Sequence, residues 1–104
     1  MDELISKLII FQKDRDWKQF HTPSNLAKSI SIEAGELLEH FQWDDQFNPE
    51  EVEKELADIF IYSIYLADSL NLNVKEIILN KIKINEDKYP TSKSKGNSIK
   101  YNKF

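Results

Sequence analysis

The stretch LADIFIYSIYLA, residues 56–67, restricts the possible folds of this chain more than any other part of it. From Ile59 to Ala67 there is no charged residue, and at about 100° per residue the apolar side chains point nearly all round a helix. Such a helix is enclosed by protein on most sides. Asp58 lies at the start of this zone, where an unpaired ionised carboxylate costs several kcal/mol. It therefore needs a compensating cation, or a structural hydrogen bond to a Lys or Tyr.

Four helical segments are predicted around this stretch. Thr22, Asn48 and Asn73 are candidate N-cap residues, and the first two are each followed by a proline, which suits the first helical position. Pro90 cannot continue the last helix. No strand-like alternation competes, and short loops favour antiparallel neighbours, so we expect an all-α fold in which the protomer is a compact, antiparallel four-helix bundle. The predicted helices run over about residues 2–14, 22–41, 48–70 and 73–89.

The length of 104 residues indicates one domain, and we expect it to comprise residues 1–90. Residues 91–104 form a basic tail with four lysines and no acid, which we expect to be extended and ordered only where it docks, for example on a neighbouring subunit. A chain this small leaves much of its surface in water, so a partner subunit would help to stabilise it.

Composition excludes several classes of protein. Cysteine is absent, which excludes disulfides and thiolate metal sites and fits a cytoplasmic protein. No apolar run approaches the roughly 20 residues that span a membrane, and no signal peptide opens the chain, so we expect no membrane partner. The net charge of −4 argues against nucleic-acid binding, but it leaves room for a small phosphorylated ligand that enters with a metal ion.

Two pairs of acids stand at i and i+3 on different predicted helices: Glu33 with Glu36, and Glu55 with Asp58. Residues at this spacing have Cβ atoms about 5–6 Å apart, which suits two carboxylates that hold one hard cation. Oxygen ligands favour Mg²⁺, with Mn²⁺ as a substitute, and protein-bound Mg²⁺ usually shares substrate phosphates. For the first pair alone, the simpler interpretation is a solvated flank of an amphipathic helix.

Three further polar side chains lie where apolar ones are expected. Tyr62 lies between Glu55 and Asp58 around the third helix. Lys81 and Asn85 fall in the middle of the apolar arc of the fourth helix. They suit a cation and an amide aimed at a buried anionic ligand. The alternative is that the lysine extends along the core towards solvent and that the asparagine caps a nearby group.

The two acid pairs, EAGE and ELAD, are separated by 18 residues between Glu36 and Glu55. This arrangement resembles the ExxE…ExxD signature of the MazG-type all-α nucleoside triphosphate pyrophosphohydrolases. The blocks RDWKQFHTPSNLA, GELLEHFQW, ELADIFIY and KIKINEDKYP, and the ending KGNSIKY, are similar to the branch of that family that includes the dCTP pyrophosphatases. The resemblance extends from about residue 12 to residue 101.

The resemblance implies a Mg²⁺-dependent enzyme that converts a nucleoside triphosphate, with dCTP or a related dNTP expected, to the monophosphate and pyrophosphate. Metal-activated water would attack the α-phosphate, with Glu36 orienting or deprotonating that water and Lys81 offsetting charge on the leaving phosphates. One departure is Leu8, where the dCTP-type enzymes carry a His, and it weakens the case for strict cytosine specificity. The implied metal ligands are Glu33, Glu36, Glu55 and Asp58. The implied substrate-binding residues are Trp17, His21, Asn25, Trp43, Tyr62, Lys81, Asn85 and Tyr89.

Members of this family form dimers, often paired into tetramers, so the resemblance also implies a homo-oligomer. Lys95 and Tyr101 of the tail would then reach the site of a neighbouring subunit. Two alternatives stay open from the residues alone. One is a helical module that binds a nucleotide or a protein without turning it over. The other is a structural bundle whose acids are only solvated.

Overall fold

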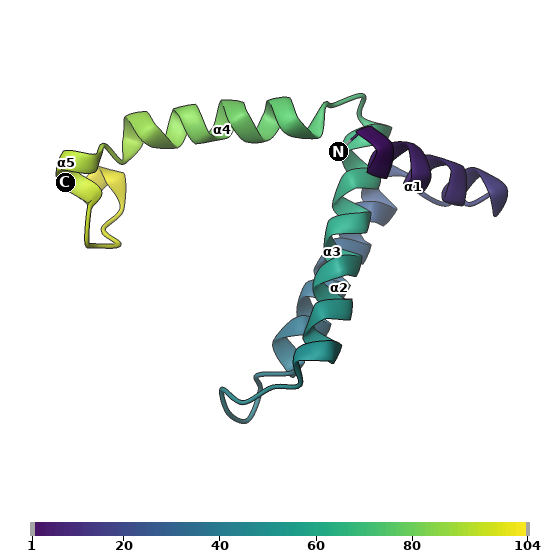
Figure 1. Cartoon of the computed structure of the whole chain (residues 1–104), viewed down its shortest axis with the longest axis horizontal. Coiled ribbons are helices and arrows are strands. Elements are labelled where there is room, and N and C mark those ends of the chain that lie inside the picture. Colours follow the sequence, from purple (N-terminus) through teal and green to yellow (C-terminus); the bar gives the residue numbers. More distant parts are fainter. Residues whose placement is uncertain (1, 104) are drawn as a thin grey trace. The chain divides into compact units, whose positions relative to one another are not determined.

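The computed structural model describes residues 2–103, without the side chain of Tyr101. The fold is all-α, as predicted, and within residues 2–103 there is no β-strand (Figure 1). Four long helices are followed by two short ones. They are α1 (Asp2–Asp14), α2 (Pro23–Glu39), α3 (Pro49–Ser69), α4 (Val74–Lys88), α5 (Thr91–Ser94) and the 3₁₀ helix η1 (Tyr101–Lys103).

The three predicted N-caps are confirmed. Thr22, Asn48 and Asn73 all have extended backbone and precede the first residue of α2, α3 and α4. Each side-chain oxygen accepts a hydrogen bond from a backbone N–H in the first turn, which satisfies a donor that has no partner within the helix. The donors are the N–H groups of Asn25 at 3.2 Å, of Glu50 and Glu51 at 3.0 and 3.3 Å, and of Glu76 at 2.9 Å.

Packing divides the chain into two compact units, one ending at Leu72 and the other beginning at Asn73. In the first unit α2 and α3 form an antiparallel helical hairpin, and α1 packs on α3 (Figure 1). The core of this unit contains Leu26, Tyr65 and Ala67, all buried. The Tyr65 hydroxyl donates a 2.8 Å hydrogen bond to the carbonyl of Leu8, which ties α3 to α1. Among the described residues, no helix is long and apolar enough to cross a membrane.

The second unit comprises α4 and the basic tail. The prediction of an extended tail is wrong at its start, where α5 forms one helical turn directly after Pro90. The backbone N–H groups of Lys93 and Ser94 donate to the Pro90 carbonyl at 2.9 and 3.0 Å. Pro90 has a φ of −63°, and its ring leaves no backbone N–H that would need a partner. It can therefore begin a helical turn, although the composition of the tail suggests an extended chain. The division into residues 1–90 and 91–104 stays a prediction.

The prediction that α3 is enclosed on most sides is not met within the first unit taken by itself. Tyr65 and Ala67 are buried, but Phe60 is 58% exposed and Leu56 is also exposed. Asp58 is exposed as well, so its carboxylate does not carry the full desolvation cost expected from the sequence. An apolar pattern indicates that a helix is covered, but it does not say which part of the protein supplies the cover.

Candidate metal centre

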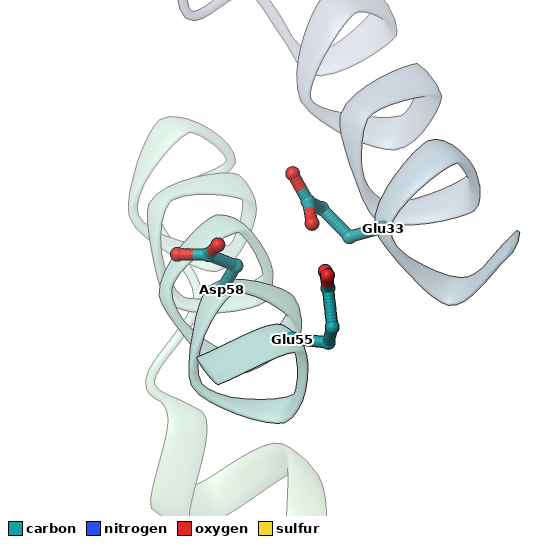
Figure 2. Close-up of side chains that lie close together, drawn as sticks. All are labelled: Glu33, Glu55 and Asp58. Atoms are coloured by element: carbon teal, nitrogen blue, oxygen red, sulfur yellow. The ribbon is translucent and has the colours of Figure 1, made fainter. Parts of the chain in front are cut away.

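Three carboxylates converge between α2 and α3. One oxygen each from Glu33, Glu55 and Asp58 lies within 4.8 Å of the other two. Figure 2 shows Glu33 reaching across from α2 towards the two acids of α3. Within the described part of the chain these acids form a group that could hold a metal ion.

The sequence places these acids together in two steps. Glu55 and Asp58 are three residues apart on one helix, so their side chains leave α3 on the same face. The antiparallel packing of α2 on α3 then brings Glu33 opposite both of them. Glu33 is half-buried and Glu55 is half-buried, whereas Asp58 is exposed, so the centre is open to solvent on one side.

The electrostatics of Glu33 favour a positively charged partner at this centre. Burial, as the largest cause, and the nearby carboxylates of Glu36, Glu55 and Asp58 together raise the pKa of Glu33 from 4.5 to about 7. Its Oε2 atom is buried and has no hydrogen-bond partner among the described residues. Ionised carboxylates only accept hydrogen bonds, so the contacts of Glu33 with Glu36 and Glu55 become hydrogen bonds only when Glu33 holds a proton. Either a proton or a cation is needed here, and a hard divalent cation fits the all-oxygen set.

Two residues border this centre. Glu36 is exposed and is not one of the three converging acids, but its carboxylate is close enough to raise the pKa of Glu33. His40 Nε2 lies 3.6 Å from Glu55 Oε1, too far for a good hydrogen bond but close enough for an ion pair if the imidazole is protonated. The role of Glu36 as a metal ligand stays a prediction.

A group of aromatic rings adjoins the acids. The His21 ring is tilted on Tyr65 with a centroid distance of 5.1 Å, and it meets the edges of Tyr62 and Trp17 at 6.4 and 6.2 Å. Burial raises the pKa of Tyr62, and the charges of Glu33, Asp58 and Glu36 raise it further. Tyr62 therefore lies between the predicted nucleoside-binding residues Trp17 and His21 and the carboxylates. The structure brings all of these into the first unit.

The other predicted site residues are on several different elements. The Asn25 side-chain amide donates to the Phe20 carbonyl at 3.0 Å, so it shapes the connector that precedes α2. Trp43 is 88% exposed and follows α2, whereas Trp17 precedes it. A helix of 17 residues is about 25 Å long, so in one chain the two tryptophans stand at opposite ends of the hairpin. Lys81 and Asn85 on α4, and Tyr89 at its C-cap, belong to the second unit, and their roles stay predictions.

Sequence reasoning missed Gln12. This residue is 4% exposed and hydrogen-bonds His21 across the α1–α2 connector. It stands one turn after Leu8 on the apolar line of α1, so a polar residue in an apolar position was the available signal. The partner could not be found by helical periodicity, because residues 15–22 between the two helices are irregular.

An antiparallel helical hairpin with converging carboxylates and an adjacent aromatic group defines an all-α protein with an acidic centre of the kind that binds a divalent cation. The chain belongs to the MazG-like family, whose model matches residues 28–104.

Relatives agree with this membership. The chain is 36% identical over 101 residues to human dCTP pyrophosphatase 1 and 37% identical over 101 residues to the bovine protein of that name, and both alignments cover 88% of this chain. It spans about three fifths of the length of these curated relatives, 59% and 60% respectively. A pyrophosphatase from Archaeoglobus fulgidus has a similar crystal structure, with a TM-score of 0.78 and 44% identity, covering 86% of this chain and 92% of that one.

Proposed function

We propose that this chain is a Mg²⁺-dependent nucleoside triphosphate pyrophosphohydrolase. It would convert a (d)NTP, with dCTP or a related dNTP as the expected substrate, to the monophosphate and pyrophosphate. The observation that carries the proposal is the convergence of Glu33, Glu55 and Asp58 around a buried, unpartnered Glu33 oxygen. The pyrophosphatase names of the relatives support the same reaction class.

The three converging acids are the proposed Mg²⁺ ligands, and Glu36 joins them at the exposed edge. Bound there, Mg²⁺ or the substitute Mn²⁺ supplies positive charge for the substrate phosphates and lowers the pKa of water. Thiolate ligation is excluded because no cysteine occurs in the sequence, and the all-carboxylate set favours a hard cation. Their mutual repulsion favours a cation over an empty centre.

The proposed reaction transfers the α-phosphoryl group to water. The water oxygen forms a bond to the α-phosphorus, the bond from that phosphorus to the α,β-bridging oxygen breaks, and pyrophosphate leaves. Glu36 accepts the proton of the attacking water, a role that suits an exposed carboxylate beside the centre rather than at its middle. Lys81 offsets charge on the leaving group.

We propose that the aromatic group binds the nucleoside part of the substrate. Trp17 is the proposed stacking surface for the base, and His21 and Tyr62 lie between it and the acids. Asn25, Asn85 and Tyr89 complete the proposed contacts to sugar and phosphates. Since Trp43 stands at the other end of the hairpin from Trp17, we propose that it serves the site of a second copy in a homodimer or homotetramer.

Incubation with single dNTPs and Mg²⁺, followed by chromatography, tests the reaction directly. The expected products are the monophosphate and pyrophosphate, and release of orthophosphate would show that the wrong bond has been assigned. Asp58→Asn and Glu36→Gln should each lower kcat by at least about 100-fold while the chain stays helical by circular dichroism. Glu53→Gln is the matched control, because Glu53 is an exposed acid on α3, the helix that carries Asp58.

Full turnover in both variants would show that the acids do not form the catalytic centre. Mg²⁺-dependent binding of dCTP without any product would instead favour a helical nucleotide-binding module. A structural bundle with solvated acids would show neither turnover nor a rise in Tm on addition of Mg²⁺.

A further inference from the structure

Gln12 is a buried amide in the apolar side of α1. Its side chain is 4% exposed, and buried polar groups of this kind are almost always hydrogen-bonded. The partner is His21, at 2.8 Å between Gln12 Nε2 and His21 Nδ1. This bond spans the irregular connector between α1 and α2, so it joins the first helix to the aromatic group.

The direction of this bond determines the form of the histidine. In this structure the amide nitrogen of Gln12 faces His21 Nδ1. Because an amide nitrogen only donates, we infer that Nδ1 accepts and that the single ring hydrogen of a neutral imidazole is on Nε2. Burial lowers the pKa of His21, which favours the neutral ring. In the part of the chain that the structure describes, Nε2 has no hydrogen-bond partner.

The surroundings of His21 also hold its ring in place. Tyr65 packs on it at 5.1 Å, and the Tyr65 hydroxyl is itself bonded to the Leu8 carbonyl. Tyr62 meets the His21 ring edge-on at 6.4 Å and connects the aromatic group with Glu33 and Asp58. The His21 ring is therefore one aromatic ring away from the acidic centre.

We propose that Gln12 is a positioning residue, which holds His21 as the Nε2–H tautomer so that the ring offers one N–H donor to an acceptor atom on the nucleoside part of the substrate. This inference rests on the proposed function and deepens it. A ligand with an oxygen or unprotonated nitrogen at that place gains a hydrogen bond. A ligand with a hydrogen-bond donor at that place is rejected, because its hydrogen would face the hydrogen on His21 Nε2 and neither could find an acceptor.

The first test reads the tautomer without catalysis. Long-range ¹H–¹⁵N spectra of the histidine-labelled full chain distinguish the two neutral forms, and His40→Gln assigns the signals because the sequence holds only two histidines. We expect His21 to carry its hydrogen on Nε2. In Gln12→Glu the carboxylate can only accept, so His21 should move its hydrogen to Nδ1 or become doubly protonated. Nδ1–H in the unaltered chain, with the amide oxygen of Gln12 as acceptor, would overturn the proposal.

The second test separates positioning from folding. Gln12→Met keeps the shape of the side chain but removes the hydrogen bond. It should raise KM for dCTP about tenfold and leave kcat within about twofold. It should have no further effect in a His21→Ala background, because both changes remove the same donor. Gln19→Met is the control, since Gln19 is exposed on the same connector and its amide donates to Asp16.

The outcomes are distinguishable from failure of the proposed function. If dCTP is hydrolysed normally but Gln12→Met leaves KM unchanged, or if its effect adds to that of His21→Ala, the positioning role is wrong and the enzyme assignment stands. If the chain neither binds nor hydrolyses dCTP, both the proposed function and the role of His21 are wrong, whichever tautomer the spectra show.

Discussion

At the scale of single residues, Glu33 is the side chain whose chemistry the structure defines most sharply. Its folded-state pKa of about 7 lies above the ordinary value of 4.5. The folded, metal-free chain therefore binds this proton more tightly than the unfolded chain does. The stabilising contribution is complete below pH 4.5 and is lost as the pH rises through 7.

We expect the metal-free chain to lose on the order of 1 kcal/mol of unfolding free energy between pH 6 and pH 8 through this group. For a chain of this length, that corresponds to a fall in Tm of roughly 4–8 °C. Mg²⁺ competes with the proton, so its apparent affinity should fall about tenfold per pH unit below 7. Thermal unfolding in buffers with EDTA or with Mg²⁺ measures both effects.

Glu33→Gln separates the contribution of this group from that of every other ionisable side chain. The variant should be more stable than the original chain at pH 8 without metal, should lack the pH dependence assigned here, and should gain little from Mg²⁺. Glu39→Gln is the control, because Glu39 is an exposed acid on the same helix. An unchanged pH dependence in Glu33→Gln would mean that the proton is held elsewhere.

The sequence located most of this centre, for a reason that is local. Glu55 and Asp58 share a helix face at any packing angle, and the helix boundaries fix which residues of α2 can lie opposite them. The exposure of Asp58 was not predictable in this way, since it depends on what covers α3. The role of Gln12 was not predictable either, because its bond to His21 depends on the path of the connector between two helices.

At the scale of elements, the helices of this chain begin where short polar side chains cap them. Asn48 satisfies two first-turn N–H groups of α3, and α3 carries two of the three converging acids. Asn48→Ala should lower the unfolding free energy by about 1 kcal/mol, because these donors lose their partner. Asn48→Asp should restore it, since a carboxylate accepts the same bonds and also suits a helix N-terminus. Chemical denaturation with a fixed m-value measures the difference.

The Asn48→Ala variant also tests whether the first turn of α3 is needed to hold the acids of the metal centre in place. Because Asn48 is seven residues before Glu55, loss of the cap should fray only the first turn of α3. Mg²⁺-dependent stabilisation should therefore persist in Asn48→Ala. Its complete loss would show that the first turn of α3 is needed to hold the acids in place.

The element boundaries were predictable because caps and proline act within a few residues. The predicted helices over about residues 2–14, 22–41, 48–70 and 73–89 match α1 to α4 within two residues at each end. The turn at Thr91–Ser94 was missed, because the lysine-rich composition of the tail outweighed the local effect of Pro90. Local signals determined the elements, but they did not determine which surfaces are covered.

At the scale of the whole molecule, each of the two units, taken by itself, leaves apolar side chains exposed. Leu38 on α2 and Leu56 and Phe60 on α3 are exposed in the first unit, and Ile78 and Ile82 are exposed on α4 of the second. Large apolar side chains at helical spacing are normally buried against another element. The small core of the first unit cannot offset many such exposures, so assembly with a second copy is expected to contribute to stability.

Phe60→Lys tests the proposed homo-oligomer. In the single chain Phe60 is 58% exposed, so a lysine there should change the unfolding free energy by no more than about 0.5 kcal/mol. If a second copy covers Phe60, the lysine must instead be desolvated, and the assembly should dissociate. We expect light scattering to give a dimer or tetramer for the original chain at micromolar concentration and a monomer for Phe60→Lys. The Tm of the original chain should also rise with protein concentration.

Glu53→Lys is the matched control, because it introduces the same charge on α3 at a position that is already polar and exposed. It should leave the mass unchanged. Because Trp43 and Trp17 stand at opposite ends of one hairpin, a monomeric Phe60→Lys should also lose affinity for dCTP, although all its acids are intact. A monomeric original chain, or a variant of unchanged mass, would show that α3 is not an interface. An enzyme that is fully active as a monomer would show that Trp43 of a second copy is not part of the site.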